Sequence, residues 1–265
     1  MKSASSNALL LVVLSFFLFL PSSATCKDVS RAIDPQADKV LRQMGQYLRG
    51  LNHFIIKAQT SYESILDSGQ KLTYLNQISI YLKRPNGLYV HRKGMIRDQD
   101  IYYDGKTLTL YGRNKRLYAT APVPPTIDEM LDYAVDVLHL TAPGSDLLYS
   151  DVYKGLMSDA LAGMYVGKNM VNGVMCHHLA YRGSEVDWQL WVEAGNRPVP
   201  RKYIITSKWI TGAPEFSVTI FEFDPKTPIA DSRFIFSPQK DAKKVPFLTP
   251  EQLQKLRKKI KEYKK

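Results

Sequence analysis

The sequence predicts an α+β fold, in which helices cover one face of an antiparallel sheet of about ten strands. Segments of alternating apolar and polar residues recur along the chain and are joined by short turns rich in Gly, Asn and Pro. Such short turns join antiparallel strands, because parallel pairs need long crossovers. Amphipathic helical patterns precede this series and interrupt it in the middle. The predicted order is one helix, several strands, two helices and several more strands.

The N-terminus has the layout of a secretory signal peptide. Lys2 precedes an apolar run from Ala8 to Leu20, and small residues such as Ala24 end it. A membrane-spanning helix needs about 20 apolar residues, so this run is short for an anchor and fits a cleaved signal. We therefore predict a signal peptide over residues 1–25 and an exported protein. An uncleaved anchor is the alternative.

The chain has two cysteines, Cys26 and Cys176. Cys26 stands where a lipoprotein signal places its acylated cysteine, but Ser23 and Thr25 differ from the residues which that signal prefers. A Cys26–Cys176 disulfide is permitted in an exported protein. The sequence leaves three states open, namely a disulfide, a buried thiol and a lipid anchor.

The net charge of +11 suggests an anionic neighbour, and the C-terminal tail holds a large part of it. Export argues against nucleic acid and favours surfaces such as phospholipid head groups. Residues 250–265 carry seven basic residues against two acidic ones, beside an apolar helical face. A basic amphipathic helix can lie on an anionic membrane, and a solvated or docked helix is the alternative. The candidate membrane-surface residues are Lys255, Lys258, Lys259 and Lys261.

Local signals justify the first helix and the strands after it. Asp34 and Pro35 suit a helix start, and apolar residues then recur at helical spacing as far as Gly50. Turn signals at Ser68–Gln70 and Pro85–Gly87 separate the strands that follow. Alternation predicts strands over residues 54–60, 72–82, 88–90, 101–103, 107–111 and 117–120.

A capping box opens the middle helical region. Thr126 and Glu129 have the spacing at which each satisfies the other's exposed amide. We predict one helix after Thr126 and a shorter one over residues 151–160. Strands resume over residues 164–170, 174–181, 186–192, 203–207 and 216–223, with Asn172-Gly173 as a hairpin turn.

No motif predicts catalysis, a metal site or a cofactor. His177 and His178 are adjacent in a predicted strand and point to opposite faces, so they cannot easily hold one ion. The polar and aromatic stretch 102–106 is explained by a tight Asp-Gly turn between two strands. We therefore predict a protein that is not an enzyme. An envelope hydrolase, with catalytic groups converging from distant segments, is the less favoured alternative.

The apolar face of the predicted sheet is rich in aromatic residues, and we expect its area to exceed what three short helices can cover. Space left there would accept an acyl chain, at about 0.8 kcal/mol for each buried CH₂ group. A fully packed core is the alternative. The candidate cavity wall is Phe54, Ile56, Tyr74, Ile78, Ile80, Leu88, Val90, Trp188, Leu190, Phe216, Val218 and Ile220. The candidate lid is Met130, Leu131, Ala134 and Leu138.

Two tryptophans in one predicted strand point to opposite faces of the sheet. Trp188 alternates with Leu190 and Val192, which predicts that it lies on the concave side. Trp191 lies among polar residues on the other side of the strand.

Several stretches resemble a family of predicted periplasmic bacterial proteins. They are Ile33-Asp34-Pro35, YYDGKTLTLY (102–111), YATAPVPPTID (118–128), DLLYSD (146–151) and VDWQLWVEAGNRPVPRKYIIT (186–206). That family is similar to the lipoprotein-localisation (LolA/LolB-like) superfamily. The resemblance implies that residues 33–248 form a half-open antiparallel β-barrel with helices over an apolar cavity. It also implies an arginine that holds the helices closed, for which Arg84, Arg92 and Arg97 are candidates.

We therefore predict a periplasmic, non-catalytic binding protein that holds a lipid or another hydrophobic ligand in a half-barrel cavity. A carrier of envelope lipids or lipoproteins is one form of this function. The expected partners are a lipid or acyl chain, an anionic membrane surface or an envelope protein, and neither nucleic acid nor a cofactor is expected. The alternative is a structural or interaction module of the envelope that acts through its basic tail.

Overall fold

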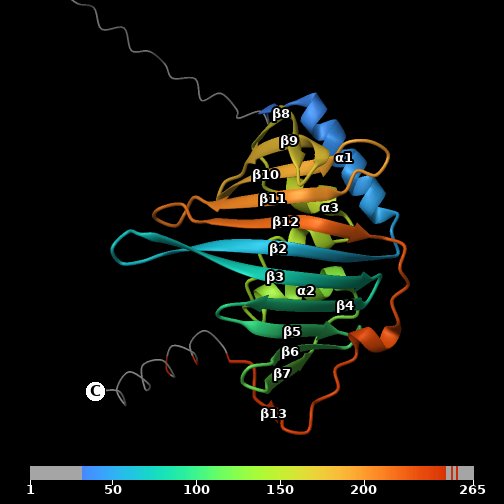
Figure 1. Ribbon diagram of the computed structural model, residues 1–265, viewed down its shortest axis with the longest axis vertical. Coiled ribbons are helices and arrows are strands. Elements are labelled where there is room, and N and C mark those ends of the chain that lie inside the picture. The colour runs from blue at the N-terminus through green and yellow to red at the C-terminus, as the bar shows by residue number, and fades with distance from the viewer. Residues whose placement is uncertain (1–31, 249–251, 253–254, 256–265) are drawn as a thin grey trace, which may run out of the picture. The chain divides into compact units, whose positions relative to one another are not determined.

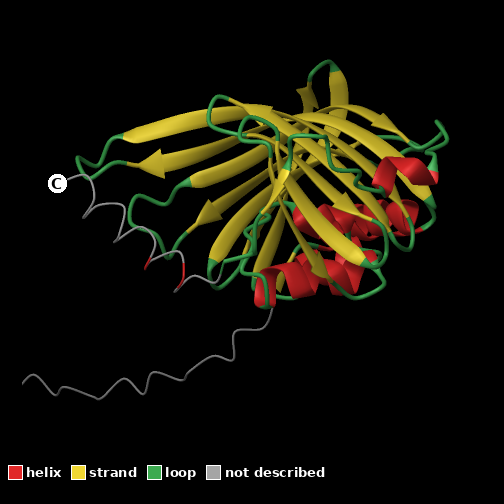
Figure 2. Ribbon diagram, turned by 90° about the horizontal axis from the view of Figure 1, so that it is seen from below, coloured by secondary structure: helices red, strands yellow, loops and turns green. Residues whose placement is uncertain are grey.

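The computed structural model describes residues 32–248 together with Gln252 and Lys255. These residues form a sheet with helices against one face, as Figures 1 and 2 show. The predicted signal peptide, Cys26 and almost all of the tail from residue 250 onward lie outside the described residues.

Within the described residues, 13 strands form one sheet. In spatial order they are β1 (Ala32–Ile33), β8 (Ala162–Val171), β9 (Val174–Arg182), β10 (Val186–Glu193), β11 (Pro200–Ser207), β12 (Glu215–Asp224), β2 (His53–Ile65), β3 (Lys71–Lys83), β4 (Gly87–Gly94), β5 (Asp98–Tyr103), β6 (Thr107–Gly112), β7 (Leu117–Pro122) and β13 (Lys243–Lys244). Only β1 and β13 pair in parallel with their described neighbours. The order is linear, so the sheet is not closed. It arches over the helices (Figure 2), and the predicted half-open barrel is confirmed.

The helices are α1 (Pro35–Arg49), α2 (Ile127–Asp136) and α3 (Val152–Met157), with the 3₁₀ turns η1 (Ser145–Leu148) and η2 (Asp231–Phe234). α1, α2, α3 and η1 cover the concave face and share one apolar core with it. α1 packs against α3, β8 and β10, whereas α2 packs against η1. η2 belongs to the C-terminal segment and contacts β4.

The predicted helix starts are confirmed in atomic detail. The Asp34 carboxylate accepts hydrogen bonds from the backbone N–H groups of Gln36 and Ala37, at 2.7 and 3.2 Å. At α2 the Thr126 Oγ1 accepts from the Glu129 N–H at 3.3 Å and donates to the Glu129 carboxylate at 2.8 Å. The Asp34 cap thus satisfies two amide groups that a helix start leaves without partners, and the Thr126 cap satisfies one. The Glu129 carboxylate accepts from the Thr126 hydroxyl, whereas the capping box predicts that it accepts from the Thr126 N–H.

Two predicted turns are also confirmed. At the β5–β6 turn the Asp104 Oδ1 accepts from the N–H groups of Lys106 and Thr107, at 3.0 and 2.8 Å. Asn172 and Gly173 join β8 to β9 with φ angles of 47° and 78°. Both angles are in the left-handed region that two-residue hairpins need. These turns fix the register that sends alternate side chains to the concave face.

Candidate functional site

The concave face of the sheet divides into a helix-covered half and an open half. The helix-covered half contains the strand positions that pack against the helices, such as Leu82 and Leu190, which are fully buried. The open half lies toward the other ends of the same strands and is only half-buried. Its apolar and aromatic side chains are Tyr62, Tyr74, Ile78, Ile205 and Phe216. The buried polar residues Thr60 and Asn76 lie among them and form a hydrogen bond at 3.4 Å.

Side chains from the helices fill the helix-covered half. α1 contributes Leu41, Met44 and Leu48, each at most 1% exposed. The wall residues buried in the same core are Phe54, Ile56, Leu88, Val90, Trp188, Leu190, Val218 and Ile220. The lid residues Met130, Leu131 and Ala134 belong to that core, and Leu138 packs at its margin. The role of these residues as a ligand wall and lid stays a prediction.

Trp188 lies on the concave side, as predicted. Its ring stacks on Tyr181 with centroids 4.1 Å apart and planes 11° apart. Gly163 makes room for this stack, because a Cβ atom there would lie 2.4 Å from the Tyr181 ring. The ring of Tyr203 meets Trp188 edge-on at 6.1 Å. The tryptophan is therefore a packed core residue at the margin of α1.

Trp191 lies on the convex side, also as predicted. Its ring stacks on His178 at 4.0 Å, and the Lys202 Nζ lies 5.3 Å from its centroid. These two side chains from neighbouring strands leave Trp191 only 9% exposed. Both faces of β10 thus carry an aromatic residue because each face has its own packing partners.

Polar contacts tie the helix-bearing segment to the sheet. Arg84 donates from Nη2 to the backbone oxygen of Tyr149, between η1 and α3, at 2.8 Å. The Ile127 N–H donates to the Pro85 oxygen and the Tyr103 hydroxyl donates to the Pro124 oxygen, each at 2.8 Å. Burial lowers the pKa of the Arg84 guanidinium. These contacts hold the start of α2 and the segment before α3 against the β3–β4 turn and the end of β5.

The other two candidate arginines lie in the open half and at its rim. Arg92 donates to Gln99 Oε1 at 3.1 Å across β4 and β5. Burial, and secondarily the charge of Arg97, lowers the pKa of Arg92. Arg97 is exposed in the β4–β5 turn. Of the three, Arg84 is the one with a described hydrogen bond to the helix-bearing segment.

A carboxyl group, Asp146, lies where η1 meets the concave face. The hydroxyl of buried Tyr203 donates to Asp146 Oδ2 at 3.5 Å. Burial raises the pKa of the Asp146 carboxyl and also that of the Tyr203 hydroxyl. A charge placed this close to an apolar core disfavours the closed position of η1.

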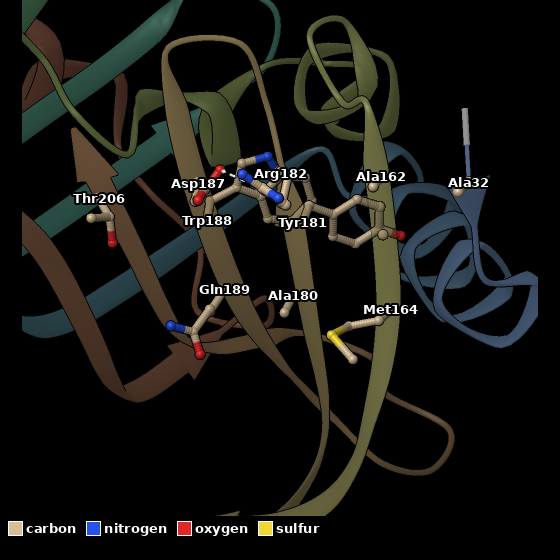
Figure 3. Close-up of a pocket in the computed structure, with 11 residues that line it drawn as sticks. Ala32, Ala162, Met164, Ala180, Tyr181, Arg182, Asp187, Trp188, Gln189 and Thr206 are labelled. Carbon is tan, nitrogen blue, oxygen red and sulfur yellow. Dashed lines mark ion pairs between the residues drawn. The ribbon is translucent and has the colours of Figure 1, made fainter. Parts of the chain in front are cut away.

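Two hollows among the described residues lie on the convex face. The first has a volume of about 380 Å³ and lies over β8 to β11, beside Met164, Ala180 and Gln189. Figure 3 shows Arg182 and Asp187 at its rim, where they form an ion pair at 3.9 Å. The second lies under the C-terminal segment. Neither lies between the helices and the concave face.

Among the described residues, no group of three or more His, Cys, Asp or Glu side chains is placed to hold a metal ion. His177 contacts Tyr165 and His178 contacts Gln189, at 2.9 and 3.0 Å, on opposite faces of β9. Cys176 is a buried free thiol whose pKa is raised by burial.

The described residues contain no helix with the length and apolar character needed to cross a membrane. Of the candidate membrane-surface residues, Lys255 is described, and it is exposed. Lys258, Lys259 and Lys261 lie outside the described residues.

Several solved structures are similar to the chain at low sequence identity. An uncharacterised conserved protein from Thermus thermophilus is 12% identical over 80% of this chain and 99% of its own, with a TM-score of 0.47. LprF from Mycobacterium bovis is 11% identical over 74% and 97%, with a TM-score of 0.46. A LolA superfamily protein from Nitrosomonas europaea is 12% identical over 76% and 97%, with a TM-score of 0.38. The fold assignment above rests on the strand order of this chain itself.

The family of the chain is assigned from its sequence. No curated protein matches the chain. The family model described as "Predicted periplasmic protein (DUF2092)" matches residues 37–248, which include all but the first two residues of α1, the other described helices and every described strand except β1. The chain therefore belongs to this family of periplasmic proteins.

Proposed function

We propose that the protein is a non-catalytic periplasmic binding protein that holds an acyl chain, or another hydrophobic ligand, on its concave face. The observation that carries this proposal is the open half, where apolar and aromatic side chains remain half-exposed on the inside of a curved sheet. Tyr62 stacks on Tyr74 at 5.1 Å, and Phe216 is the strand partner of Tyr62.

The open half would bind the ligand first. Each buried CH₂ group contributes about 0.8 kcal/mol, so even a short length of chain laid along these side chains gains several kcal/mol. This first contact needs no movement of α1, whose apolar face stays in the core. Deeper entry would require the segment from α2 to α3 to move, since its side chains occupy the helix-covered half.

Polar contacts tie the segment that would move to α1 as well as to the sheet. The Tyr153 hydroxyl donates to the Asp38 carboxylate at 2.5 Å, and Arg49 pairs with Asp151. Arg84, Pro85 and Tyr103 anchor one part of it, and Asp146 lies where it meets the core. A buried ionisable carboxyl favours opening, because opening returns the carboxylate to water. Burial of the Asp146 carboxyl therefore destabilises the closed arrangement of this segment.

Binding of a fluorescent fatty acid to the purified protein tests the proposal. Tyr74→Asp places a charge in the open half, and we expect it to weaken binding at least tenfold. Leu75→Asp is the matched control, since Leu75 is the next residue of β3, is 53% exposed and points to the convex face. Equal binding by both variants would contradict the proposed site. Lipid extraction and mass spectrometry of protein from its native envelope should recover an acyl-containing ligand.

The second candidate function is an interaction module of the envelope, and the filling of the helix-covered half favours it. The core there resembles that of an ordinary packed domain, with Leu41, Leu82 and Leu190 fully buried. Protein that carries no lipid and takes up no fatty acid would support this candidate over the first.

A further inference from the structure

The convex face carries a second feature that the proposed function does not use. After β12, residues 225–242 run past the ends of β3 and β4 and on to β13 (Figure 1). We call these residues the C-terminal strap. Between the strap and the convex face lies a hollow of about 670 Å³. This volume is within the range of about 300–1,000 Å³ that is typical of small-molecule sites.

Aromatic contacts fix the strap beyond the hollow. Phe234 is 4% exposed and packs where Gly87 has no side chain, since a Cβ atom at Gly87 would lie 2.7 Å from its ring. Phe236 sits among Tyr102, Tyr111 and Tyr118, with ring centroids 5.0–5.5 Å apart. The position of the strap is therefore set independently of any ligand.

Polar contacts complete the attachment at the other points of the strap. At its start the Asp224 Oδ1 accepts hydrogen bonds from the N–H groups of Lys226 and Thr227, at 2.8 and 3.1 Å. Lys83 pairs with Asp231 at 2.6 Å, and Arg116 pairs with Asp241 at 2.6 Å. The hollow thus has a firm wall on the strap side as well as on the sheet side.

The lining of the hollow combines hydroxyl groups, apolar groups and one charged side chain. The floor includes Ile55, Tyr81 and Tyr102 from β2, β3 and β5, and the strap contributes Ile229 and Ile235. The hydroxyl-bearing residues are Tyr81, Tyr102, Thr227, Ser232 and Ser237. The charged residue is Arg233.

Arg233 brings a positive charge without a described acidic partner. Its guanidinium lies over the rings of Tyr81 and Tyr89, 4.9 and 5.5 Å from their centroids. The ion pairs found among the described residues do not include Arg233, although the neighbouring Lys83 has such a partner. These cation–π contacts with two tyrosines position the guanidinium and use none of its N–H groups, which would be free to pair with an anion.

We propose that this hollow binds an acidic sugar. The carboxylate would pair with Arg233, which presents a planar fork that suits a carboxylate. The hydroxyl groups of Tyr81, Thr227, Ser232 and Ser237 would pair with the hydroxyls of a sugar ring, and the tyrosine and isoleucine surfaces match its C–H faces. A simple fatty acid fits less well, because hydroxyl groups interrupt the apolar lining. The site lies on the opposite face from the proposed hydrophobic ligand and does not depend on it.

Titration calorimetry on the full chain tests this site, with glucuronic acid and N-acetylmuramic acid as probes and glucose as the neutral comparison. We expect both acids to bind and glucose to bind at least tenfold more weakly. Arg233→Ala should weaken binding of the acids at least tenfold, while Arg233→Lys should retain part of it. Arg97→Ala is the matched control, because Arg97 is an exposed arginine in the β4–β5 turn, and it should bind as the unchanged protein does.

Several outcomes would overturn the proposal. They are binding of neither acid, equal binding of glucose, undiminished binding by Arg233→Ala, and displacement of the acids by dodecanoate. If Arg233→Ala lowers the melting temperature, Ser237→Ala decides the matter at constant fold. A severalfold loss of affinity then supports the site, and an unchanged affinity refutes it. Fatty-acid uptake on the concave face should stay the same in all these variants.

Discussion

The helix-covered half and the open half of the concave face are made of the same strands, yet they differ in what covers them. Along β3, Leu82 is fully buried under the helices, whereas Ile78 and Tyr74 are half-buried. Along β2, Phe54 is 1% exposed and Tyr62 is half-buried. Strand pattern therefore decides which face is apolar, and the helices decide which part of that face becomes core.

The largest expected effect is a difference in unfolding free energy between truncations in the helix-covered half and in the open half. Leu82→Ala should lower the free energy of unfolding by about 2–5 kcal/mol, because it leaves a cavity in a fully packed core. Ile78→Ala, on the same face of the same strand, should cost about 1 kcal/mol because that side chain is already part-exposed. Urea unfolding measures both. Equal losses would mean that the open half is as tightly packed as the covered half.

The sequence predicts which face of the sheet is apolar, but it does not predict which part of that face the helices cover. Alternation placed Leu82, Ile78 and Tyr74 on one face, and the capping signals at Asp34 and Thr126 placed the helix starts. These signals are local, so a single sequence carries them. Which strand positions lie under a helix depends on how far the loops let each helix reach. Hydrophobic periodicity carries no information about how far a helix reaches over the sheet.

The hollow on the convex face is even harder to predict from the sequence than the extent of helix cover. The strap has no helical or alternating pattern, so nothing in the sequence indicates that it lies against β2–β5. The two-residue strands β1 and β13 were missed for the same reason, since two residues cannot show a period. The strongest signal in the strap is the apolar run Phe234-Ile235-Phe236, which contains its two aromatic residues.

A second prediction tests how tightly the margin of the covered half is packed. Gly163→Ala should cost about 1–3 kcal/mol, because its Cβ would push Tyr181 away from Trp188. Gly155→Ala is the control, since a Cβ in that position of α3 meets nothing within 4 Å. It should be neutral or should stabilise the protein by up to about 1 kcal/mol, as a helical Gly→Ala change does. Thermal unfolding of the two variants checks the difference.

The third prediction concerns the contact between the sheet and the segment that covers it. Arg84→Ala removes the hydrogen bond to the Tyr149 oxygen and should cost about 1–2 kcal/mol. Hydrogen exchange should become faster at amides of residues 127–157 and remain unchanged in β10. Arg92→Ala, which removes a contact within the open half, should leave exchange in 127–157 as it was. Uniform acceleration in both variants would show that Arg84 has no special link to the cover.

Replacement of Asp146 should have a smaller effect on stability than the changes above, and it should stabilise the protein. Burial raises the pKa of its carboxyl in the folded state, so the folded state binds a proton more readily than the unfolded state. This contribution to stability is present at low pH and is lost as pH rises through the folded-state pKa. Asp146→Asn should therefore stabilise the protein at pH 7, by about 1 kcal/mol, and keep the contact with Tyr203. The gain should shrink toward pH 4, and a gain that is constant with pH would refute this explanation.

The smallest expected effect on stability comes from removing residues 250–265, which lie outside the matched family region. This tail carries seven basic residues against two acidic ones, and the spacing of Leu253, Leu256 and Ile260 predicts an apolar helical face. We expect the truncated protein to unfold at the same temperature and to lose most of its binding to vesicles that contain phosphatidylglycerol. Replacing Lys255, Lys258, Lys259 and Lys261 by Gln keeps the apolar face and isolates the charge. If that variant still binds at low salt, the apolar face and not the charge provides the attachment. If truncation changes nothing, the anionic partner of this basic protein must contact the folded domain itself.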